Sequence, residues 1–369
     1  MINTEQLFKV LKKRKLNFFT GVPDSILKSL SAHLNKHKNH IIATNEGTAV
    51  SMAIGYHLAT KKIGCVYMQN SGLGNAINPL ISISNSKVYS IPILLIIGWR
   101  GAPKTKDEPQ HVVKGKITIN LLKLLGIEYC ILNKENDLKK LERLISKSAK
   151  FNKPVACLIK NNTLSINSKI KITNKHIKKL PLRKDIILTL LNNINKNDDI
   201  ISTTGYTSRE VNYLRKLNNI KKGRDFYMIG GMGHASSVSL TRSLSKNKKN
   251  IICLDGDGSL LMHMGSLFTI GTYAKKNFKH ILFNNGSHES VGGQDTNAKL
   301  INFKNLVLSL GYKNYFLLQS KSNIKSKIKN FLKSKGPSFL EVKINNGSIK
   351  NLDRPNNFIE IKKKFMNIR

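Results

Sequence analysis

The sequence predicts an α/β protein built from two open parallel-sheet domains with helices on both faces. Short apolar, β-branched runs alternate with helix-like stretches along most of the 369 residues. Most of these runs lack a polar side, which is typical of parallel strands that crossover helices cover on both faces. A polar, lysine-rich stretch divides the runs into two groups, and the chain is long enough for two domains of ordinary size.

The apolar runs predict six strands on each side of the lysine-rich stretch. Their ranges are 17–20, 40–43, 64–69, 91–98, 128–132 and 154–159, then 199–202, 226–229, 250–254, 280–283, 315–318 and 338–342. Helix-like stretches lie between them, as at 47–60, 137–151, 208–217 and 235–244. We therefore expect a first domain over 1–165, a basic linker over 166–183 and a second domain over 184–369.

The chain is strongly basic, with 62 Lys and Arg against 21 Asp and Glu and a formal net charge of +41. Binding to nucleic acid is one interpretation, because a basic surface attracts phosphates. However, the lysines are dispersed along helix-like segments, and no zinc-finger, helix-turn-helix or RNP-like pattern is found. Abundant Lys, Asn and Ile are typical of an AT-rich coding sequence. We interpret the charge as compositional drift that helps to attract anionic substrates, and expect no nucleic-acid partner.

The four cysteines show no CxxC spacing and lie in or beside apolar stretches, which predicts buried free thiols in a reducing compartment. The longest strongly apolar run, 91–99, is too short to span a bilayer. The N-terminal segment lacks the apolar region of a secretory signal. We therefore expect a cytoplasmic protein with no membrane partner. The cysteines are Cys65, Cys130, Cys157 and Cys253.

The most informative feature is a pair of polar strand ends in the second half. One apolar strand ends in a segment containing Gly256, Asp257 and Gly258, and the next ends at Asn285, followed by Gly-Ser. Ligands of open α/β sheets bind beyond the carboxyl ends of strands, where glycines let the backbone approach a phosphate. The Asp257 carboxylate, the Asn285 amide oxygen and the Ser287 backbone carbonyl are suitable ligands for Mg²⁺. The alternative is an ordinary turn without a ligand.

This pairing resembles the thiamine-diphosphate motif of the transketolase–pyruvate decarboxylase superfamily. The resemblance implies thiamine diphosphate and Mg²⁺ as cofactors, a pyrimidine-binding domain over 1–165 and a diphosphate-binding domain over 184–369. It also implies a carboxylate after the second strand that hydrogen-bonds N1′ of the aminopyrimidine. Glu46 stands there, in the string ATNEGTA, and is expected to be that catalytic group. A helix-start charge is the alternative interpretation of Glu46.

Further cofactor contacts are implied by the same resemblance. Met232 is expected to wedge under the cofactor, and the Gly230 carbonyl to accept a bond from the 4′-amine; a core methionine is the alternative. Thr204 and Gly205 are expected at the diphosphate, although a helix cap by Thr207 is equally compatible with the sequence. The complete expected set of cofactor-binding residues is Glu46, Thr204, Gly205, Gly230, Met232, Gly256, Asp257, Gly258, Ser259 and Asn285.

Several strings closely resemble the phosphonopyruvate decarboxylase family, over residues from about 19 to 340. They are GVPDS, NEGTAV, QNSGLGN, GWRG, DEPQH, TTGYTSRE, GMGHASS, GDGSLLMHMGSL and NNGSHESVGGQ. Many members of the superfamily carry a third domain between the other two, but this chain is too short for one. In this respect it is similar to the small two-domain decarboxylases. It departs from the family pattern at Tyr206, where Lys is expected, and at Ser287, where Ala is expected. The first departure removes a possible anion contact.

The resemblance implies decarboxylation of 3-phosphonopyruvate to phosphonoacetaldehyde and CO₂, a step of phosphonate biosynthesis. Proton transfer near the keto oxygen is expected from Asp24, His111 and His288, because His titrates near neutrality. Some of the candidate residues also have a simpler interpretation: a helix cap for Asp24, an ordinary residue at a strand end for Arg100, and a surface turn for His288 and Glu289. His111 is expected to lie in a polar loop. The expected substrate-contacting residues are Ser71, Arg100, Gln110 and Glu289.

The partners and rival functions follow from the same comparison. In the superfamily the equivalent of Glu46 faces the GDG loop of another subunit, so a homodimer or higher oligomer is expected. Sulfopyruvate decarboxylase is the close rival, and the SHESVGGQ string favours phosphonopyruvate over it. An acetolactate-synthase-like enzyme and a nucleic-acid-binding protein on an inactive enzyme fold are the remaining alternatives.

Overall fold

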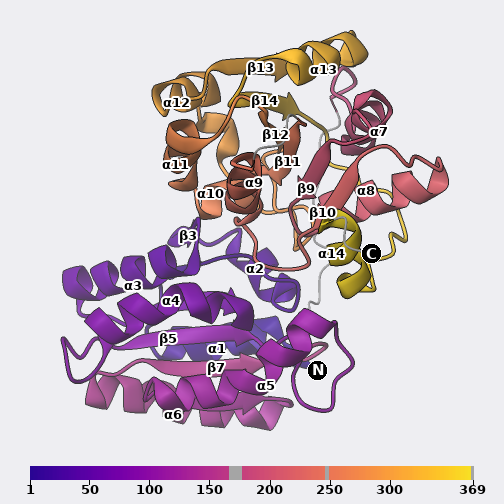
Figure 1. The fold of residues 1–369 in the computed structure, drawn as a ribbon. Helices are drawn as coiled ribbons and strands as arrows, with labels where there is room; N and C mark the ends of the chain where they lie inside the picture. Colours follow the sequence, from indigo (N-terminus) through magenta and orange to yellow (C-terminus); the bar gives the residue numbers. More distant parts are fainter. Residues whose placement is uncertain (166–176, 246–248, 367–369) are drawn as a thin grey trace. The chain divides into compact units, whose positions relative to one another are not determined.

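The computed structural model describes residues 1–165, 177–245 and 249–366 of the chain (Figure 1). It divides into two compact units. The first comprises Met1–Ile172 with His288–Gln294, and the second comprises Thr173–Ser287 with Asp295–Arg369. Each unit is built around its own six-stranded parallel sheet.

The sheet of the first unit has the strand order β3-β2-β4-β5-β7-β6. All neighbouring strands are parallel, so every connection crosses over one face of the sheet. The central strands are apolar and buried except for Gln69 at the end of β4, as expected for strands covered on both faces. The strands are β2 (Phe19–Gly21), β3 (His40–Ile42), β4 (Gly64–Gln69), β5 (Ile93–Gly98), β6 (Glu128–Leu132) and β7 (Val155–Ile159).

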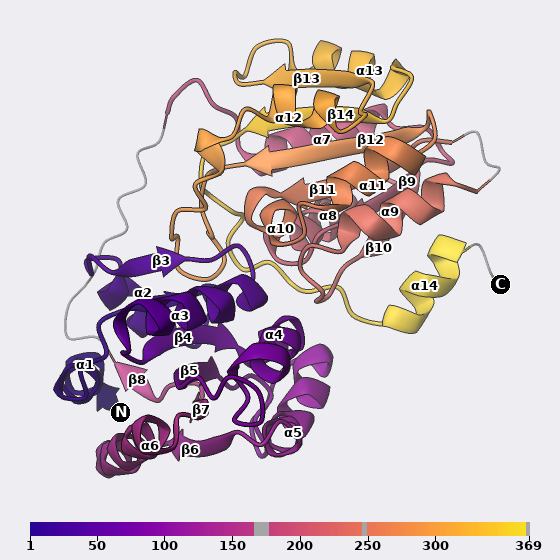
Figure 2. The same cartoon turned by 90° about the vertical axis from the view of Figure 1, so that its left-hand side faces the viewer.

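Helices cover both faces of this sheet (Figures 1 and 2). Alternate residues of the strands point to opposite faces: Cys65 and Tyr67 of β4 lie in one apolar cluster, Val66 and Met68 in the other. The first cluster includes side chains of α1 (Thr4–Lys13), α2 (Lys28–Leu34) and α6 (Leu138–Phe151). The second includes side chains of α3 (Glu46–Thr60), α4 (Leu73–Pro79) and α5 (Pro109–Leu124).

The sheet of the second unit has the order β10-β9-β11-β12-β14-β13, and its neighbours are also all parallel. Its central strand β12 is buried along its whole length. The strands are β9 (Asp199–Ser202), β10 (Arg224–Tyr227), β11 (Ile251–Gly256), β12 (Phe278–Asn284), β13 (Asn314–Leu318) and β14 (Ser338–Lys343).

Helices again cover both faces of the second sheet (Figure 2). The cluster on one face includes α7 (Arg183–Asn193), α8 (Tyr206–Leu217) and α13 (Ile324–Lys333). The cluster on the other includes α9 (Ala235–Ser243), α10 (Asp257–Met262), α11 (Ser266–Tyr273), α12 (Phe303–Ser309) and α14 (Phe358–Met366). Short turns of other helix types are η1 (Asn70–Gly72), η2 (Leu80–Ser84), η3 (Glu135–Asp137) and η4 (Ala298–Leu300).

The predicted fold class is confirmed, and each of the twelve predicted strands overlaps a strand of the structure. The largest displacement is in β10, which lies two residues before the predicted 226–229. One parallel pair was not predicted: β1 (Ile2–Asn3) with β8 (Leu164–Ser165). Two-residue strands carry too few residues for an alternation to be recognised.

The predicted linker 166–183 lies partly outside the described residues, since the description resumes at Ile177. Its last residue, Arg183, is the first residue of α7 and is buried against Glu210, with Nε 3.1 Å from the carboxylate. Among the helices that the structure describes, none combines the length and apolar character needed to cross a membrane.

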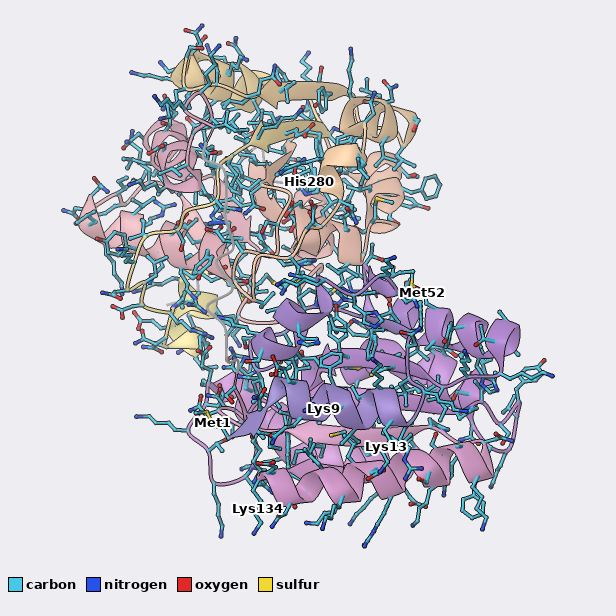
Figure 3. All side chains as sticks on the ribbon, turned by 180° about the vertical axis from the view of Figure 1, so that it is seen from behind. Met1, Lys9, Lys13, Met52, Lys134 and His280 are labelled. Carbon is cyan, nitrogen blue, oxygen red and sulfur yellow. The ribbon has the colours of Figure 1, made fainter. Side chains whose placement is uncertain are left out.

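Most of the described lysines of both units are exposed or half-buried, although Lys279 of β12 is fully buried. Figure 3 shows the side chains of Lys9, Lys13 and Lys134 extending from the first unit, whereas His280 lies inside the second. All three lysines are exposed. This dispersal agrees with the absence of a basic motif in the sequence.

Candidate functional site

In the first unit, four strands carry predicted site residues just beyond their carboxyl ends. Asp24 follows β2, Glu46 follows β3, Ser71 follows β4 and Arg100 follows β5. Because these strands are parallel neighbours, the four residues lie along one edge of the sheet, which is where open α/β sheets bind ligands.

Glu46 is held in a buried position by its surroundings. It opens α3, whose N-cap Asn45 accepts a hydrogen bond from Thr48, and only 5% of Glu46 is exposed. Asn75 donates a hydrogen bond of 2.7 Å to Oε2. A Cβ at Gly72 would lie 2.2 Å from Oε1, so that position must be glycine for the carboxylate to fit. Burial raises the pKa of Glu46, and the bond from Asn75 opposes the rise.

Asp24 combines a turn-capping oxygen with an unsatisfied one. Oδ2 accepts hydrogen bonds from the backbone of Ile26 (3.0 Å) and Leu27 (3.2 Å), so it caps the turn before α2. The alternative of a helix cap was wrong, because the N-cap of α2 is Leu27 and has no side-chain capping bond. Oδ1 is buried and has no hydrogen-bond partner among the described residues. A Cβ at Gly98 would lie 2.1 Å from Oδ2. Burial raises the pKa of Asp24 to about 6, against the opposing effect of its backbone hydrogen bonds.

Arg100 is already paired along one edge of its guanidinium group. Nε and Nη2 donate to the two carboxylate oxygens of Asp107 at 2.8 and 2.5 Å, and Nη1 donates to Ser25 at 3.0 Å. Three of its five N–H groups are therefore used within the fold. The bidentate edge expected to hold the substrate is occupied by Asp107, which leaves only the remaining N–H groups of Nη1 and Nη2 for an anion.

His111 lies in the first turn of α5, so the prediction of a polar loop was wrong. The charged residues near His111 hide the helical periodicity of apolar residues in the sequence. Pro109, at the first position of the helix, is nevertheless a typical signal for a helix start. Burial lowers the pKa of His111 to about 4, with Arg100 adding to the effect. The ring is thus neutral at pH 7, although the charge of Asp107 opposes the lowering of its pKa. Its Nδ1 and Oε1 of Gln110 are buried without hydrogen-bond partners among the described residues.

Lys114, one turn further along α5, was not predicted as a site residue. It is half-buried, and burial lowers its pKa while the nearby Glu46 raises it. Lys114 also contributes to the lowered pKa of His111. A lysine close to both groups therefore places a cation at the same sheet edge. The sequence signal was present in the string HVVKGK, but lysines are so abundant that it could not be distinguished.

In the second unit, Asp257 begins α10 directly after β11 and is 4% exposed. Gly258 donates its backbone N–H to Oδ1 (2.8 Å), and the Thr296 hydroxyl donates to Oδ2 (2.9 Å). Burial raises the pKa of Asp257 to about 6, and hydrogen bonds from Thr296 and the backbone of Gly258, Gly286 and Ser287 oppose the rise. The structure therefore brings Asp257 against the loop that follows β12.

That loop contains the other predicted metal ligands. Oδ1 of Asn285 accepts the backbone N–H of Ser287 at 3.1 Å, and the Ser287 Oγ is buried without a hydrogen-bond partner among the described residues. Beyond them, the backbone of His288 and Gln294 pairs at 2.8 Å, which closes residues 288–294 into a compact turn. His288 and Glu289 are half-buried on this turn.

The other predicted cofactor residues also gather at strand ends of the second unit. Ser259 is linked to Thr203 after β9 (2.8 Å) and accepts the backbone N–H of Gly233 (3.0 Å). Thr204 donates to the carbonyl of Ile229, in the segment that contains Gly230 and Met232. Met232 is half-buried and so is not a core methionine.

The start of α8 has open backbone donors. Its N-cap is Gly205, with φ of 93° and no side-chain capping bond, so the predicted cap by Thr207 was wrong. Thr207 lies inside the helix because the positive φ of Gly205 starts the helix at Tyr206. The Tyr206 ring packs under the guanidinium groups of Arg183 (5.7 Å) and Arg209 (5.9 Å), so cations remain near the position where the family pattern has Lys.

These arrangements provide two kinds of chemistry. The first unit offers a buried carboxylate, a second carboxyl that titrates near pH 6, and nearby cations. The second unit offers hard oxygen donors around Asp257 and an uncapped helix start, which suit a divalent cation and a diphosphate. The buried carboxylate of Asp257 and the unsatisfied Oγ of Ser287 fit a bound Mg²⁺.

Comparisons with known proteins agree with this chemistry. The thiamine pyrophosphate enzyme N-terminal TPP binding domain matches residues 1–122, and the C-terminal TPP binding domain matches residues 203–342. A phosphonopyruvate decarboxylase from Streptomyces viridochromogenes is 30% identical, covering 96% of this chain and 91% of its own length. A sulfopyruvate decarboxylase from Methanosarcina acetivorans is 28% identical over 95% and 93%, respectively. Sulfopyruvate decarboxylase subunit alpha from Methanococcus maripaludis is 36% identical over 42% of this chain and 93% of its own.

The chain therefore belongs to the thiamine pyrophosphate enzyme family. It is a decarboxylase of 2-oxo acids, a carboxy-lyase that depends on thiamine pyrophosphate, which is the same compound as thiamine diphosphate.

Proposed function

We propose that this enzyme decarboxylates 3-phosphonopyruvate to phosphonoacetaldehyde and CO₂ in phosphonate biosynthesis. The carrying observation is the group of unsatisfied polar atoms and cations at one sheet edge of the first unit. Oδ1 of Asp24, Oε1 of Gln110 and Nδ1 of His111 are buried without hydrogen-bond partners among the described residues. Because such groups cost free energy when unpaired, they indicate a polar ligand. Arg100 and Lys114 make an anionic ligand favourable there.

The cofactor contacts remain as the sequence predicts them. Thiamine diphosphate, when bound, supplies an electron sink for the electrons that CO₂ leaves behind. Glu46 would hold the aminopyrimidine of the cofactor and accept its hydrogen bond. The diphosphate and Mg²⁺ would be held in the second unit, with the metal on Asp257, Asn285 and the carbonyl of Ser287. The remaining proposed contacts are Thr204, Gly205, Gly230, Met232, Gly256, Gly258 and Ser259.

The substrate contacts follow from the charges of the first unit. Lys114 and the free N–H groups of Arg100 would bind the phosphonate, and Ser71, Gln110 and Glu289 would orient the 2-oxo acid. A bound dianion beside His111 would raise the pKa of that ring from about 4 by electrostatic attraction. The ring could then hold the proton that the product needs, with Asp24 and His288 as the other groups proposed to transfer protons.

We further propose that the chain acts as a homodimer or higher oligomer in the cytoplasm. A site assembled from two copies would close both sheet edges against water, as the superfamily resemblance implies. The cytoplasmic location rests on the free thiols, which suit a reducing compartment.

Sulfopyruvate is the second candidate substrate. Two relatives with similar sequence identity to this chain are named for different substrates, one for phosphonopyruvate and one for sulfopyruvate. Both compounds are pyruvates that carry an anionic group at position 3. The string SHESVGGQ over 287–294 favours phosphonopyruvate.

A parallel assay tests the proposal. CO₂ release is measured with thiamine diphosphate and Mg²⁺ on phosphonopyruvate, sulfopyruvate and pyruvate, and we expect the highest kcat/KM with phosphonopyruvate. Lys114→Met should lower kcat/KM by about tenfold or more for the two substrates that carry a second anionic group but leave pyruvate little changed, because a charge-assisted bond to that group is lost. Lys116→Met, on the exposed side of the same helix, is the matched control. Preference for sulfopyruvate would establish the second candidate, and preference for pyruvate would defeat both.

A further inference from the structure

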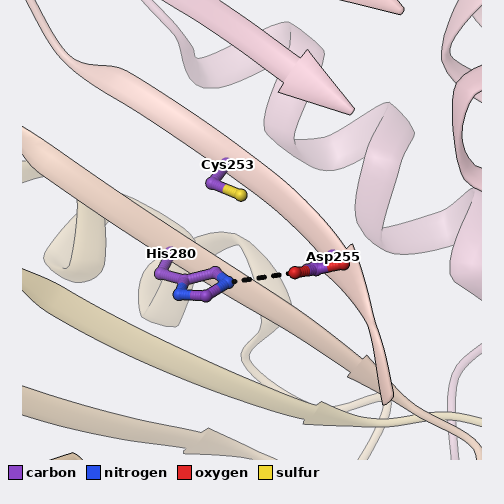
Figure 4. A group of neighbouring side chains, drawn as sticks. All are labelled: Cys253, Asp255 and His280. Atoms are coloured by element: carbon purple, nitrogen blue, oxygen red, sulfur yellow. Dashed lines mark ion pairs between the residues drawn. The ribbon is translucent and has the colours of Figure 1, made fainter. Parts of the chain in front are cut away.

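Three side chains with metal-binding atoms gather inside the second unit, and none of them is assigned a role above. Cys253 and Asp255 lie on β11, two residues apart and so on the same face of the sheet. His280 lies on β12, directly opposite Cys253 in the register (Figure 4). The thiol, a carboxylate oxygen and a ring nitrogen all lie within 4.8 Å of one another, and each residue is fully buried.

Two atoms of this cluster have no hydrogen-bond partner. Oδ2 of Asp255 and Nε2 of His280 make no hydrogen bond with any described residue. They face each other at 3.6 Å, which is too long for a hydrogen bond (Figure 4). A buried carboxylate oxygen and a buried imidazole nitrogen are both costly when unpaired. Their arrangement indicates that a further atom belongs between them.

The outer atoms of the same two side chains are fixed. Nδ1 of His280 bonds the hydroxyl of Tyr312 at 3.0 Å, and its ring packs edge-on against Phe339 with centroids 5.0 Å apart. Oδ1 of Asp255 accepts the backbone N–H of Gly256 at 3.0 Å. Metal ligands typically have such partners, which orient the ligand and leave the inner atom for the metal.

The spacing and the ligand types agree with a tetrahedral ion. Two nitrogen or oxygen ligands about 2.0–2.1 Å from Zn²⁺ lie roughly 3.4 Å apart at the tetrahedral angle. The 3.6 Å between Asp255 and His280 is close to this value. Thiolate and imidazole favour zinc and similar transition metals, whereas Mg²⁺ prefers oxygen ligands alone.

We propose that Cys253, Asp255 and His280 bind one divalent transition metal ion of the zinc class, separate from the Mg²⁺ site proposed at Asp257. The ion ties β11 to β12 just before the strand ends that carry Asp257 and Asn285. Its role is structural, because all three ligands are closed to solvent and no substrate reaches them.

The test uses the full-length enzyme saturated with thiamine diphosphate and Mg²⁺. Co²⁺ is supplied during expression as well as by titration, since the cluster is closed to solvent. We expect about one Co²⁺ per chain with a thiolate-to-cobalt absorption band, displaced by Zn²⁺, and a higher Tm than the metal-free protein. Cys253→Ala should abolish the band and weaken metal binding by at least about tenfold. Cys157→Ala, which removes a buried thiol of the first unit, is the matched control and should keep the band.

Any of three results would overturn the proposal, two from metal loading and one from NMR. One is wild-type protein that shows no thiolate band and contains no transition metal under either loading condition. The other is equal metal content in the wild type, Cys253→Ala and His280→Phe. If nitrogen NMR shows both ring nitrogens of His280 protonated with metal present, a direct His280–Asp255 ion pair replaces the metal and the proposal fails. None of these measurements uses decarboxylation, so they stand apart from the test of the proposed function.

Discussion

The two units share one topology but carry different chemistry. When the six strands of each sheet are numbered in chain order, both sheets have the strand order 2-1-3-4-6-5. The residues after equivalent strands differ. After the first strand, the first unit has Asp24, whereas the second unit has Thr203 and Thr204. After the second strand, the first unit has Glu46, whereas the second unit has the segment that contains Met232.

The difference teaches that the sheet supplies positions and the connecting loops supply function. The first unit places acidic groups in buried positions, where desolvation raises the pKa of Asp24 and Glu46. The second unit places hydroxyl groups, glycines and one carboxylate at the carboxyl ends of the strands of its own sheet, and backbone N–H groups are directed at Asp257. Proton transfer is therefore assigned to one unit and anchoring of an anion and metal to the other, and the variants below should separate these roles.

The largest effect is expected for Glu46→Gln. The amide cannot accept the proton that a carboxylate accepts, so turnover should fall by about 10³-fold or more, whereas binding of thiamine diphosphate should change little. CO₂ release and calorimetric titration of the cofactor measure the two quantities. Glu142→Gln, at a half-buried carboxylate of α6 that pairs with Lys13 and Arg14, is the control. Full activity of Glu46→Gln with normal cofactor binding would refute the division of roles.

Asp257→Ala should show the opposite division. Loss of a metal ligand should weaken binding of thiamine diphosphate in the presence of Mg²⁺ by at least about tenfold, since metal and diphosphate bind together. Excess cofactor should restore part of the activity, which it cannot do for Glu46→Gln. Calorimetry with and without Mg²⁺ measures this, and Asp353→Asn at an exposed position is the control. Unchanged cofactor affinity would contradict the metal assignment.

The smallest effect concerns stability and pH at Asp24. Its pKa of about 6 in the folded chain lies above the ordinary value of 3.8, so the folded state retains a proton between these values. Stability from this group is therefore fully present below about pH 4 and is lost as pH rises through about 6. Asp24→Asn removes this loss, so the Tm of the variant relative to wild type should increase from pH 4 to pH 7. A constant difference would show that the carboxyl does not titrate in this range.

Much of the fold could be predicted from the sequence because buried parallel strands leave continuous apolar runs, as at β4 and β5. The predicted site residues were found from strings that combine a strand end with glycine or a charged group. Asn75 and Gly72 could not be assigned, because only folding brings them to Glu46. The cluster at Cys253 could not be predicted either, since His280 is 27 residues from Cys253 in sequence and becomes its neighbour through the pairing of β11 and β12.

The short pair of β1 and β8 has an evolutionary consequence. It brings the two ends of the first sheet's polypeptide together, Ile2 beside Leu164. All strands of that sheet lie within 19–159, and all strands of the second lie within 199–343. A break of the gene between these ranges would therefore remove no strand from either sheet, and one continuous open reading frame and two separate ones can encode the same pair of sheets.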